Sequence, residues 1–352
     1  MSPTRMTPAD PGPFRLRHGT GDLATAAAAL TGELPARPLA EVLAKANRQT
    51  TRKGKTTAFG TMSPPPADWY RFQPGDDDTA DWYPQGVAGS SEAGRTDVRA
   101  LAVSWYWKPV GAAGERGVRI SLVDLAGGRY RHVLLVHPEA GGSYRPVNVH
   151  AGGIAWYGDL LYVADTARGL RVFDLRAILE VDGDDDRIGR QGGKHHAFGY
   201  RYVLPQMDAW TSSGDARFSF LSIDRTTTPH SLVSGEYVDP AADPGRTGRV
   251  ARWPLSAGGT LLAGAGGEAP ATETLAMPAA KIQGALCLDG TWYLSQAASA
   301  SRNGALLVAR PGKAVQRRGF PVGPEDLTHW AGGRIWSVTE FRGRRALFAV
   351  PA

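Results

Sequence analysis

Polar side chains that could bind a ligand or move a proton stand at the head of five similar segments of the chain. Listed in chain order, they are Gln85, His150, Arg217, Gln283 and the pair Glu325–Asp326. Amides and a guanidinium supply hydrogen bonds in fixed directions, and an imidazole titrates near neutral pH. A carboxyl group that faces an imidazole shifts both pKa values, and such a pair can transfer a proton. This set therefore predicts one polar site with acid–base chemistry.

We expect His150 to act as the acid–base residue, with Glu325 or Asp326 as its partner. Successive side chains on a strand point to opposite faces, so only one of the two acids can face the site. The expected ligand-binding residues of this region are Gln85, Gln283, Arg217, Trp82 and Tyr83. The alternative is structural: the amides bridge neighbouring strands, and His150 is a hydrogen-bonded core residue.

Small residues follow several of these positions, among them Gly86, Gly152 and Gly284. We interpret them as places where a ligand or water could approach the backbone closely. No nucleophile-elbow, zinc-protease, phosphate-loop or dinucleotide-binding motif accompanies the polar set. The lone cysteine, Cys287, excludes a disulfide within the chain and is expected to be a buried thiol.

A long excursion at 183–196 carries two further candidate ligand-binding residues, His195 and His196. Just before and within it, Asp182, Asp184 and Asp186 are candidate metal ligands, because closely spaced carboxylates can wrap a Ca²⁺ ion. The full calcium-loop pattern is absent, since Arg187 occupies the position of its glycine. A solvated acidic loop is the alternative, and no other cofactor is indicated.

The elements that must position these residues are short strands. Segment 150–175 predicts three of them, at 153–156, 160–165 and 170–174, separated by turns rich in Gly, Asp and Arg. Similar units recur, with spacings of roughly 40–70 residues, near those of propeller repeats. They cover 85–125, 218–255, 283–310 and 325–350. Weaker fourth strands are predicted at 130–136, 198–204, 271–277 and 313–318, and the last unit should take its fourth strand from 56–61 or 69–72.

A single unit of this size cannot bury both of its faces, whereas units stacked around an axis can. The predicted fold is therefore all-β: a single five-bladed β-propeller over 61–352, preceded by a partly helical, irregular extension over 1–60. Short helices are expected at 21–30 and 38–48, and the Pro-rich segment 1–18 is expected to be loosely ordered. A sixth degenerate blade or a β-sandwich is the structural alternative.

Composition agrees with one turn-rich domain, since the 352 residues include 44 Gly and 25 Pro and are 42% hydrophobic. The net charge of +6 comes from scattered cations without an aromatic stacking motif, so a nucleic-acid partner is not expected. No membrane association is expected either, because no 18-residue apolar run occurs. Without a signal-peptide pattern the chain reads as cytoplasmic, or as secreted if the sequence is a mature form. A monomer is expected.

At the level of its repeats, segment 85–352 resembles bacterial five-bladed propeller proteins, a class that includes arabinanase-type glycosidases and lectin-like binders. The resemblance implies a carbohydrate or other small polar ligand. Glycosidases of that type carry carboxylates on the inner strands of their first three blades. The matching positions here are Gln85, His150 and Arg217, with Asp81 and Asp215 nearby but out of register. This departure weighs against a conventional two-carboxylate glycosidase.

The predicted function is an enzyme of hydrolase or lyase type. Its substrate would be a small polar, glycan-like or specialised-metabolite molecule, bound at the mouth of the central channel. Two alternatives remain open: a non-catalytic sugar- or metabolite-binding propeller, and a protein-interaction scaffold.

Overall fold

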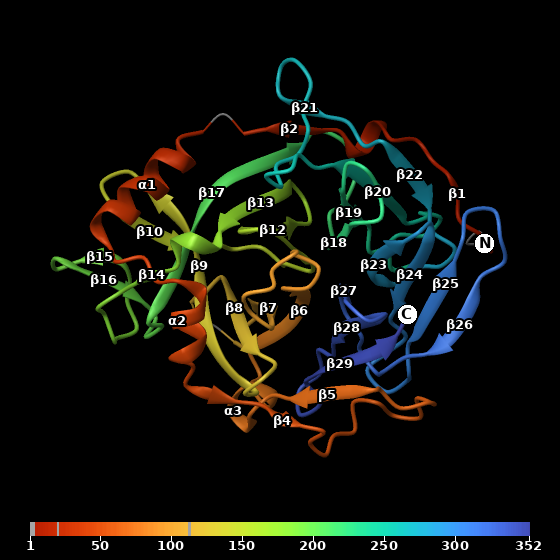
Figure 1. Ribbon diagram of the computed structural model, residues 1–352, viewed down its shortest axis with the longest axis horizontal. Coiled ribbons are helices and arrows are strands. Elements are labelled where there is room, and N and C mark those ends of the chain that lie inside the picture. The colour runs from red at the N-terminus through yellow and green to blue at the C-terminus, as the bar shows by residue number, and fades with distance from the viewer. Residues whose placement is uncertain (1–3, 20, 112–113) are drawn as a thin grey trace.

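Antiparallel strands dominate the protein, whose computed structural model describes residues 4–19, 21–111 and 114–352 (Figure 1). The first two meanders contain β6 (Trp82–Gly89), β7 (Ala100–Trp107), β8 (Val118–Asp124) and β9 (Arg129–Glu139), then β11 (Ile154–Tyr157), β12 (Leu160–Asp165), β13 (Gly169–Asp174) and β17 (Tyr202–Ser212). They merge into one sheet, because β17 also pairs in parallel with β9. The strands predicted in segment 150–175 are confirmed.

Three further meanders follow along the chain. They are β18 (Phe220–Asp224), β19 (Ser231–Gly235), β20 (Arg249–Pro254) and β22 (Glu273–Ala276); β23 (Ile282–Leu288), β24 (Thr291–Gln296), β25 (Ala305–Ala309) and β26 (Gln316–Gly319); and β27 (Thr328–Trp330), β28 (Arg334–Val338) and β29 (Ala346–Pro351). The last meander is completed by β5 (Asp68–Arg71), which pairs with β29. Of the two candidates for this strand, 69–72 is confirmed within a residue, and 56–61 is wrong, because it forms turns.

The meanders stand around a common centre, with their first strands innermost (Figure 1). Strand β11 contacts β6 and β18, β18 contacts β23, and β27 returns to β6, so the architecture is of propeller type. Glycines make the close approach possible. A Cβ on Gly86 would lie 2.7 Å from the Ile154 nitrogen, and one on Gly284 would lie 2.7 Å from the Asp326 Cα. Our interpretation of these two glycines was wrong: neighbouring backbone, not a ligand, occupies their space.

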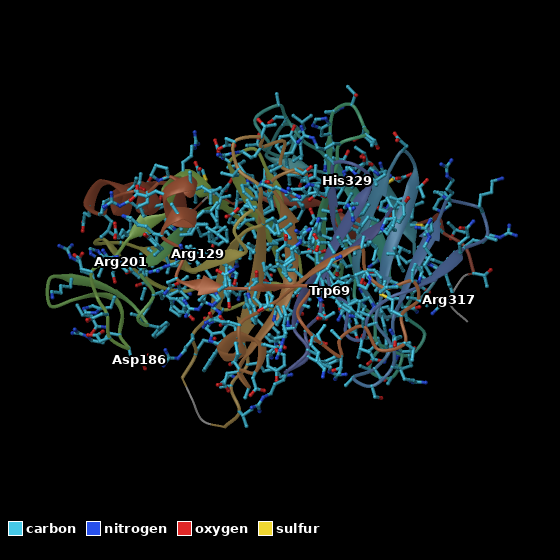
Figure 2. The ribbon with its side chains drawn as sticks, turned by 60° about the horizontal axis from the view of Figure 1, so that its bottom comes forward. Trp69, Arg129, Asp186, Arg201, Arg317 and His329 are labelled. Atoms are coloured by element: carbon cyan, nitrogen blue, oxygen red, sulfur yellow. The ribbon has the colours of Figure 1, made fainter. Side chains whose placement is uncertain are left out.

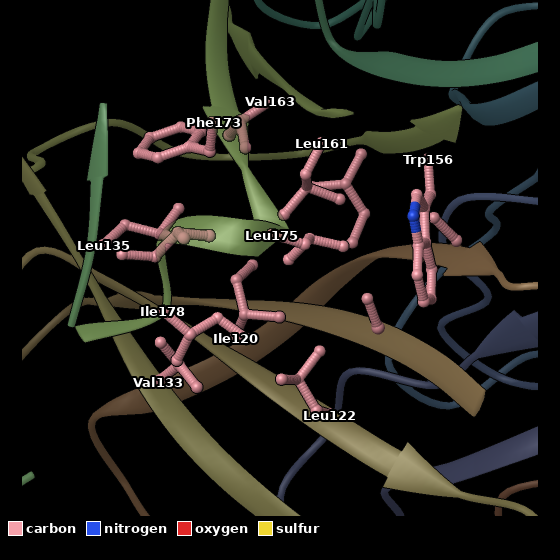
Figure 3. Close-up of a cluster of buried hydrophobic side chains, with 14 of the residues drawn as sticks. Ile120, Leu122, Val133, Leu135, Trp156, Leu161, Val163, Phe173, Leu175 and Ile178 are labelled. Carbon is pink, nitrogen blue, oxygen red and sulfur yellow. The ribbon is translucent and has the colours of Figure 1, made fainter. Parts of the chain in front are cut away.

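Large apolar side chains fill the space between the sheets. Figure 3 shows one cluster, in which Ile120 and Leu122 of β8 and Val133 and Leu135 of β9 face Leu161 of β12. Several tryptophans of the repeats are buried, and so is Cys287, where burial raises the pKa of the thiol to about 12. The free cysteine is therefore an unreactive core residue at neutral pH.

The N-terminal part wraps the outside of the sheets and covers their outer edges (Figure 1). Its elements are β1 (Thr7–Pro8), η1 (Gly12–Phe14), β2 (Leu16–His18), α1 (Leu23–Glu33), α2 (Leu39–Ala44), β3 (Arg48–Gln49), β4 (Thr51–Arg52) and α3 (Pro74–Asp77). The two expected helices are confirmed as α1 and α2. Strand β1 pairs with β22, β2 with β17, and β3 with β9.

The expectation that 1–18 is loosely ordered is wrong for residues 4–18; residues 1–3 lie outside the described part. Met6, Phe14 and Leu16 are completely buried between the outer strands. The Pro-rich composition of this segment did not predict its order, because the order comes from three apolar side chains that each fill a gap at a sheet edge.

Shorter elements complete the structure. They are β10 (Ser143–Pro146), η2 (Leu175–Ala177), β14 (Leu179–Glu180), the hairpin of β15 (Ile188–Gln191) and β16 (Lys194–Ala197), and β21 (Glu268–Ala269). Among the residues that the structure describes, no helix is long and apolar enough to span a membrane.

Met6 tests whether the N-terminal segment belongs to the core. It packs with Phe220, Val233 and Met277, so Met6→Ala is expected to lower the free energy of unfolding by about 2–3 kcal/mol. Urea unfolding followed by tryptophan fluorescence measures this change. The exposed neighbour Arg5 supplies the control, since Arg5→Ala should change stability by less than about 0.5 kcal/mol. Equal midpoints for Met6→Ala and the unsubstituted protein would contradict the packing.

Candidate functional site

A polar cavity of ≈ 490 Å³ opens where the inner strands begin. Its lining residues are Gln85, His150, Gly152, Thr166, Arg217, Ser219, Tyr237, Gln283 and Glu340. The structure thus brings together four of the predicted site residues, although they come from four different meanders. His150 and Arg217 stand just before β11 and β18, Gln283 stands at the start of β23, and Gln85 stands at the irregularity within β6. They converge because these strands meet around one centre.

Two carboxyl groups form the acidic part of the cavity. Glu340 lies in the wall, and Glu325 is buried behind it and hydrogen-bonded to it. Gln85 Nε2 donates to Glu340 Oε2 at 3.3 Å, and Gln283 Nε2 donates to Glu325 Oε1 at 3.1 Å. Burial raises the pKa of both carboxyl groups, and the charges of Glu340 and Asp326 raise the pKa of Glu325 further. The protonated form is therefore favoured most at Glu325, which in that form donates to Glu340.

His150 stands on the other side of Gln85. The Gln85 amide nitrogen donates to the Pro84 carbonyl at 2.9 Å, which leaves its Oε1 to accept from His150 Nε2 at 2.8 Å. This assignment puts the proton on Nε2 and the lone pair on Nδ1. His150 is open to the cavity, and desolvation together with the nearby Lys108 lowers its pKa to about 4, which favours the neutral imidazole at pH 7. Tyr106 packs against the ring, with the centroids 4.2 Å apart.

The positive charge of the cavity is already paired. Arg217 binds Asp243 through two hydrogen bonds of 2.6 and 2.7 Å. Asp243 follows β19 in the long turn before β20, so this turn holds the guanidinium at the rim. Arg217 in turn lowers the pKa of Asp243. With His150 neutral, the wall offers hydrogen-bonding groups and little net positive charge.

Asp326 does not line the cavity, in contrast to its predicted role. It is completely buried and accepts from the backbone nitrogens of Ile154 at 3.0 Å and Val87 at 3.4 Å. It therefore ties β6 and β11 together at the centre. The expected alternation holds, since Glu325 turns toward the cavity and its neighbour turns away.

Trp82 and Tyr83 were predicted to bind ligand, but neither lines the cavity. Trp82 is buried under the Arg119 guanidinium, 4.4 Å from its ring centroid. Tyr83 packs on Tyr106 at 5.7 Å, so it stands behind the residue that supports His150. The physical reason is a bulge in β6 between Pro84 and Val87, which shifts the facing of the residues before it relative to those after it.

The excursion at 183–196 is the β15–β16 hairpin and lies away from the cavity. His195 stacks on Tyr144 and bonds the Gly142 carbonyl at 3.0 Å, while His196 Nδ1 lies 2.8 Å from Asp185. Both predicted ligand-binding histidines are thus part of the hairpin's packing. Packing of the hairpin onto β10 explains why they are buried despite their place in a long loop.

The structure does not gather the candidate metal ligands Asp182, Asp184 and Asp186 into a site. Arg116 binds both oxygens of Asp186 at 2.6 Å, and Figure 2 shows Asp186 at the edge of the molecule. Among the described residues, no group of three or more His, Cys, Asp or Glu is placed to hold a metal ion. The predicted Ca²⁺ site therefore has no structural support.

Glu340 is the main residue that the sequence analysis missed, together with Thr166, Ser219 and Tyr237. It lies two residues beyond the end of β28, next to Thr339. The sequence signal that could have identified Glu340 is its position shortly after the second strand of the last repeat. Only the fold shows that it meets Glu325.

A second, smaller cavity of ≈ 200 Å³ lies at the opposite ends of the inner strands. Glu92, which follows β6, lines it together with Arg225 and His329. Thr328 Oγ1 donates to Glu92 Oε2 at 2.9 Å, and the His329 nitrogen donates to Oε1 at 3.2 Å. Burial nevertheless raises the pKa of Glu92 to about 8.

No protein-family model and no curated protein sequence matches the chain. Among solved structures, a GH43_1 enzyme from Xanthomonas citri is 11% identical with a TM-score of 0.40, covering 93% of each chain. The PQQ-bound aldose sugar dehydrogenase from Streptomyces coelicolor is 15% identical with a TM-score of 0.37, covering 87% of this chain and 83% of that one. A GH43 β-xylosidase/α-arabinofuranosidase from a compost metagenome is 9% identical with a TM-score of 0.38, covering 78% and 92%. These likenesses are too weak to assign a family or an activity to the chain.

Proposed function

We propose that the chain is an enzyme that binds a small, uncharged, hydroxyl-rich molecule, such as a sugar or polyol, in the central cavity and performs acid–base chemistry on it. The proposal is carried by the arrangement of Glu340 and His150 in the cavity wall, with Glu325 buried behind Glu340. The pKa values of the two carboxyl groups are raised, whereas the pKa of His150 is lowered to about 4. General acid–base catalysis requires one group that can donate a proton and another that can accept one.

The proposed scaffold is a five-bladed β-propeller over 61–352, with 1–60 as an extension that covers its outer edges. The count is supported by the five innermost strands β6, β11, β18, β23 and β27, each of which begins one antiparallel meander. Pairing of β29 with β5 supports closure of the ring by chain from the N-terminal side.

The lining supports a hydroxyl-rich ligand. Gln283 offers an amide, and Thr166, Ser219 and Tyr237 offer hydroxyls, all of which can both donate and accept. Arg217 is already paired with a carboxylate, which disfavours selection of an anion. The volume of ≈ 490 Å³ lies within the range of roughly 300–1,000 Å³ that is common for small-molecule sites.

The chemistry would be of hydrolase or lyase type. His150 Nδ1 could accept a proton from a water or a substrate hydroxyl, while the Glu325–Glu340 proton passes to the leaving oxygen. Gln85 connects Glu340 to His150, and Gln283 holds Glu325 in place. One proton is taken and one is given, so the net charge of the site does not change. The starting protonation is restored when a proton moves from His150 back to the carboxyl pair through water.

A non-catalytic binder of the same ligand is the second candidate, because the hydrogen bonds from Gln85 to His150 and Glu340 could serve only to shape the cavity. A protein-interaction scaffold has less support. Among the described residues the large exposed hydrophobic side chains are Val110 and Leu262, which do not form a patch by themselves.

A binding screen tests the proposal. Neutral monosaccharides, disaccharides and polyols, with uronic acids as the charged comparison, would be titrated into the protein and followed by calorimetry. Each hit would then be examined for product formation. Saturable binding of neutral members supports the proposal, and product formation separates the enzyme from the binder. Failure of all members to bind contradicts both candidates.

Gln283 gives the corresponding variant. Gln283→Ala is expected to weaken binding of a hit about tenfold, because one hydrogen bond to the ligand or to Glu325 is worth about 1–1.5 kcal/mol. The matched control is Gln191→Ala in the β15–β16 hairpin, which should bind like the unsubstituted protein. Equal affinities for both variants would place the ligand elsewhere.

A further inference from the structure

A third pocket, also polar, lies on the outer flank of the molecule and shares no residue with the central cavity or with the cavity at Glu92. Its volume is ≈ 210 Å³, and its lining residues are Asn47, Arg48, Arg131, His132, Phe198, Gly199, Tyr200 and Arg201. Three guanidinium groups and no carboxylate face this space. They come from three separate parts of the chain: β3, β9 and the segment that leads into β17. Figure 2 shows Arg201 and Arg129 of this flank far from Arg317, which lies at the other end of the molecule.

Carboxylates around the pocket do not balance these cations. Arg201 Nε binds Glu180 at 2.6 Å, and Glu180 also binds Arg37 at 2.5 Å. Arg131 forms no ion pair with a carboxylate within the described ranges. It stacks on Tyr202, 5.2 Å from the ring centroid, and donates to the Lys45 carbonyl at 3.4 Å. The Arg131 charge therefore has no counter-ion.

Asp76 cannot supply that counter-ion, because its two oxygens are already occupied. They accept from Arg119 at 2.8 Å, from Tyr130 at 2.5 Å and from His132 at 3.0 Å. Burial lowers the pKa of His132 to about 3, so this histidine is neutral and adds no charge. Arg48 lines the pocket and is ion-paired with Asp76, with its Nε 3.2 Å from a carboxylate oxygen. Asp76 is thus shared by Arg48 and Arg119, and its charge is not free for Arg131.

We propose that this pocket binds a tetrahedral oxyanion, either a free phosphate or sulfate ion or the phosphoryl or sulfo group of a larger molecule. Guanidinium groups bind such oxyanions through paired, charge-assisted hydrogen bonds. The pocket has the volume of roughly seven liquid waters, which suits one such group with a few waters. Bound there, the anion neutralises Arg131 and accepts from Arg48 and Arg201.

Calorimetric titration of inorganic phosphate into the full chain at low ionic strength tests the site. Saturable binding is expected, and Arg131→Gln should weaken it at least tenfold. The control is Arg317→Gln, which removes the same charge from the exposed strand β26, where Arg317 donates to Gln296 at 2.8 Å. Phosphate affinity should then stay within about twofold, because a distant exposed charge is screened by salt and water. An equal loss in both variants, or no saturable binding at all, would overturn the proposal.

Two further measurements distinguish the source of the anion and guard against misfolding. A sugar monophosphate that binds more tightly than inorganic phosphate or sulfate indicates a group of a larger molecule, and equal affinities indicate the free ion. Arg201→Gln alters a side chain that is 55% exposed, so it should fold normally and still weaken phosphate binding several-fold. Unchanged binding in Arg201→Gln would also overturn the proposal.

Discussion

Titration of Glu92 is expected to remove about 4 kcal/mol of stability between pH 5 and pH 9. Glu92 is buried at the second cavity, and burial raises its pKa from 4.5 to about 8 in the folded protein. In the unfolded chain the carboxyl group regains its ordinary pKa. Because the folded form holds the proton more tightly, its contribution is fully present below about pH 4.5 and is lost as the pH rises through 8.

The hydrogen bonds of Glu92 limit the loss of stability that accompanies its ionisation. Thr328 Oγ1 and the backbone nitrogens of His329 and Ile223 donate to the carboxylate and stabilise its charged form. Arg225 lies near enough to favour the charged form as well. Desolvation of a group without an ion-pair partner outweighs these interactions, so the neutral acid is preferred up to mildly alkaline pH.

Glu92→Gln isolates this effect, since an amide keeps the size of the neutral acid and cannot ionise. Urea unfolding would be measured at pH 5, 7 and 9 for both proteins. The stability of the variant relative to the unsubstituted protein should rise by about 4 kcal/mol from pH 5 to pH 9. Glu139→Gln is the control, because Glu139 is exposed, with Arg145 3.3 Å away, and its effect should stay below about 1 kcal/mol. Parallel stability profiles for Glu92→Gln and the unsubstituted protein would contradict the raised pKa.

The repeating strands and the polar residues at their heads could be predicted because both depend on local patterns. Turn residues between short runs of β-branched and aromatic side chains mark the strands, and equal positions in each repeat lie at equal places in the ring. Gln85, His150, Arg217 and Gln283 converge for this reason. Nothing about their roles follows from the convergence alone.

The remainder depends on contacts that no local pattern records. The β6 bulge redirects Trp82 and Tyr83, and a neighbouring strand rather than a ligand fills the space beside Gly86. Met6, Phe14 and Leu16 are too widely spaced for a periodic signal, yet each fills a gap at a sheet edge. The role of Glu340 could not be predicted for the same reason, because its contact with Glu325 arises from the packing of the last meander.

Glu340→Gln is expected to slow turnover of the substrate about 10²–10⁴-fold, the usual contribution of a positioned acid or base. The amide oxygen can still accept from Gln85, so the shape of the cavity and the affinity for the ligand should change little. The substitution leaves the proton on Glu325 and removes the carboxyl group through which that proton reaches the cavity. Steady-state kinetics should therefore show a loss in kcat with KM nearly unchanged, and calorimetry should give a Kd within about threefold of the original.

Glu325→Gln separates a proton reservoir from a simple hydrogen bond. Its amide can donate to Glu340 as the protonated Glu325 does, but it cannot pass that proton on. If Glu325 only orients Glu340, this variant keeps its rate, whereas a shared catalytic proton predicts a loss comparable to that of Glu340→Gln. The exposed Glu139→Gln again serves as the control. Full rates in both pair variants would exclude the pair from the chemistry and leave the cavity as a binding site. Loss of rate with retained affinity requires that the pair acts on the reacting atoms, since no change in binding then accounts for it.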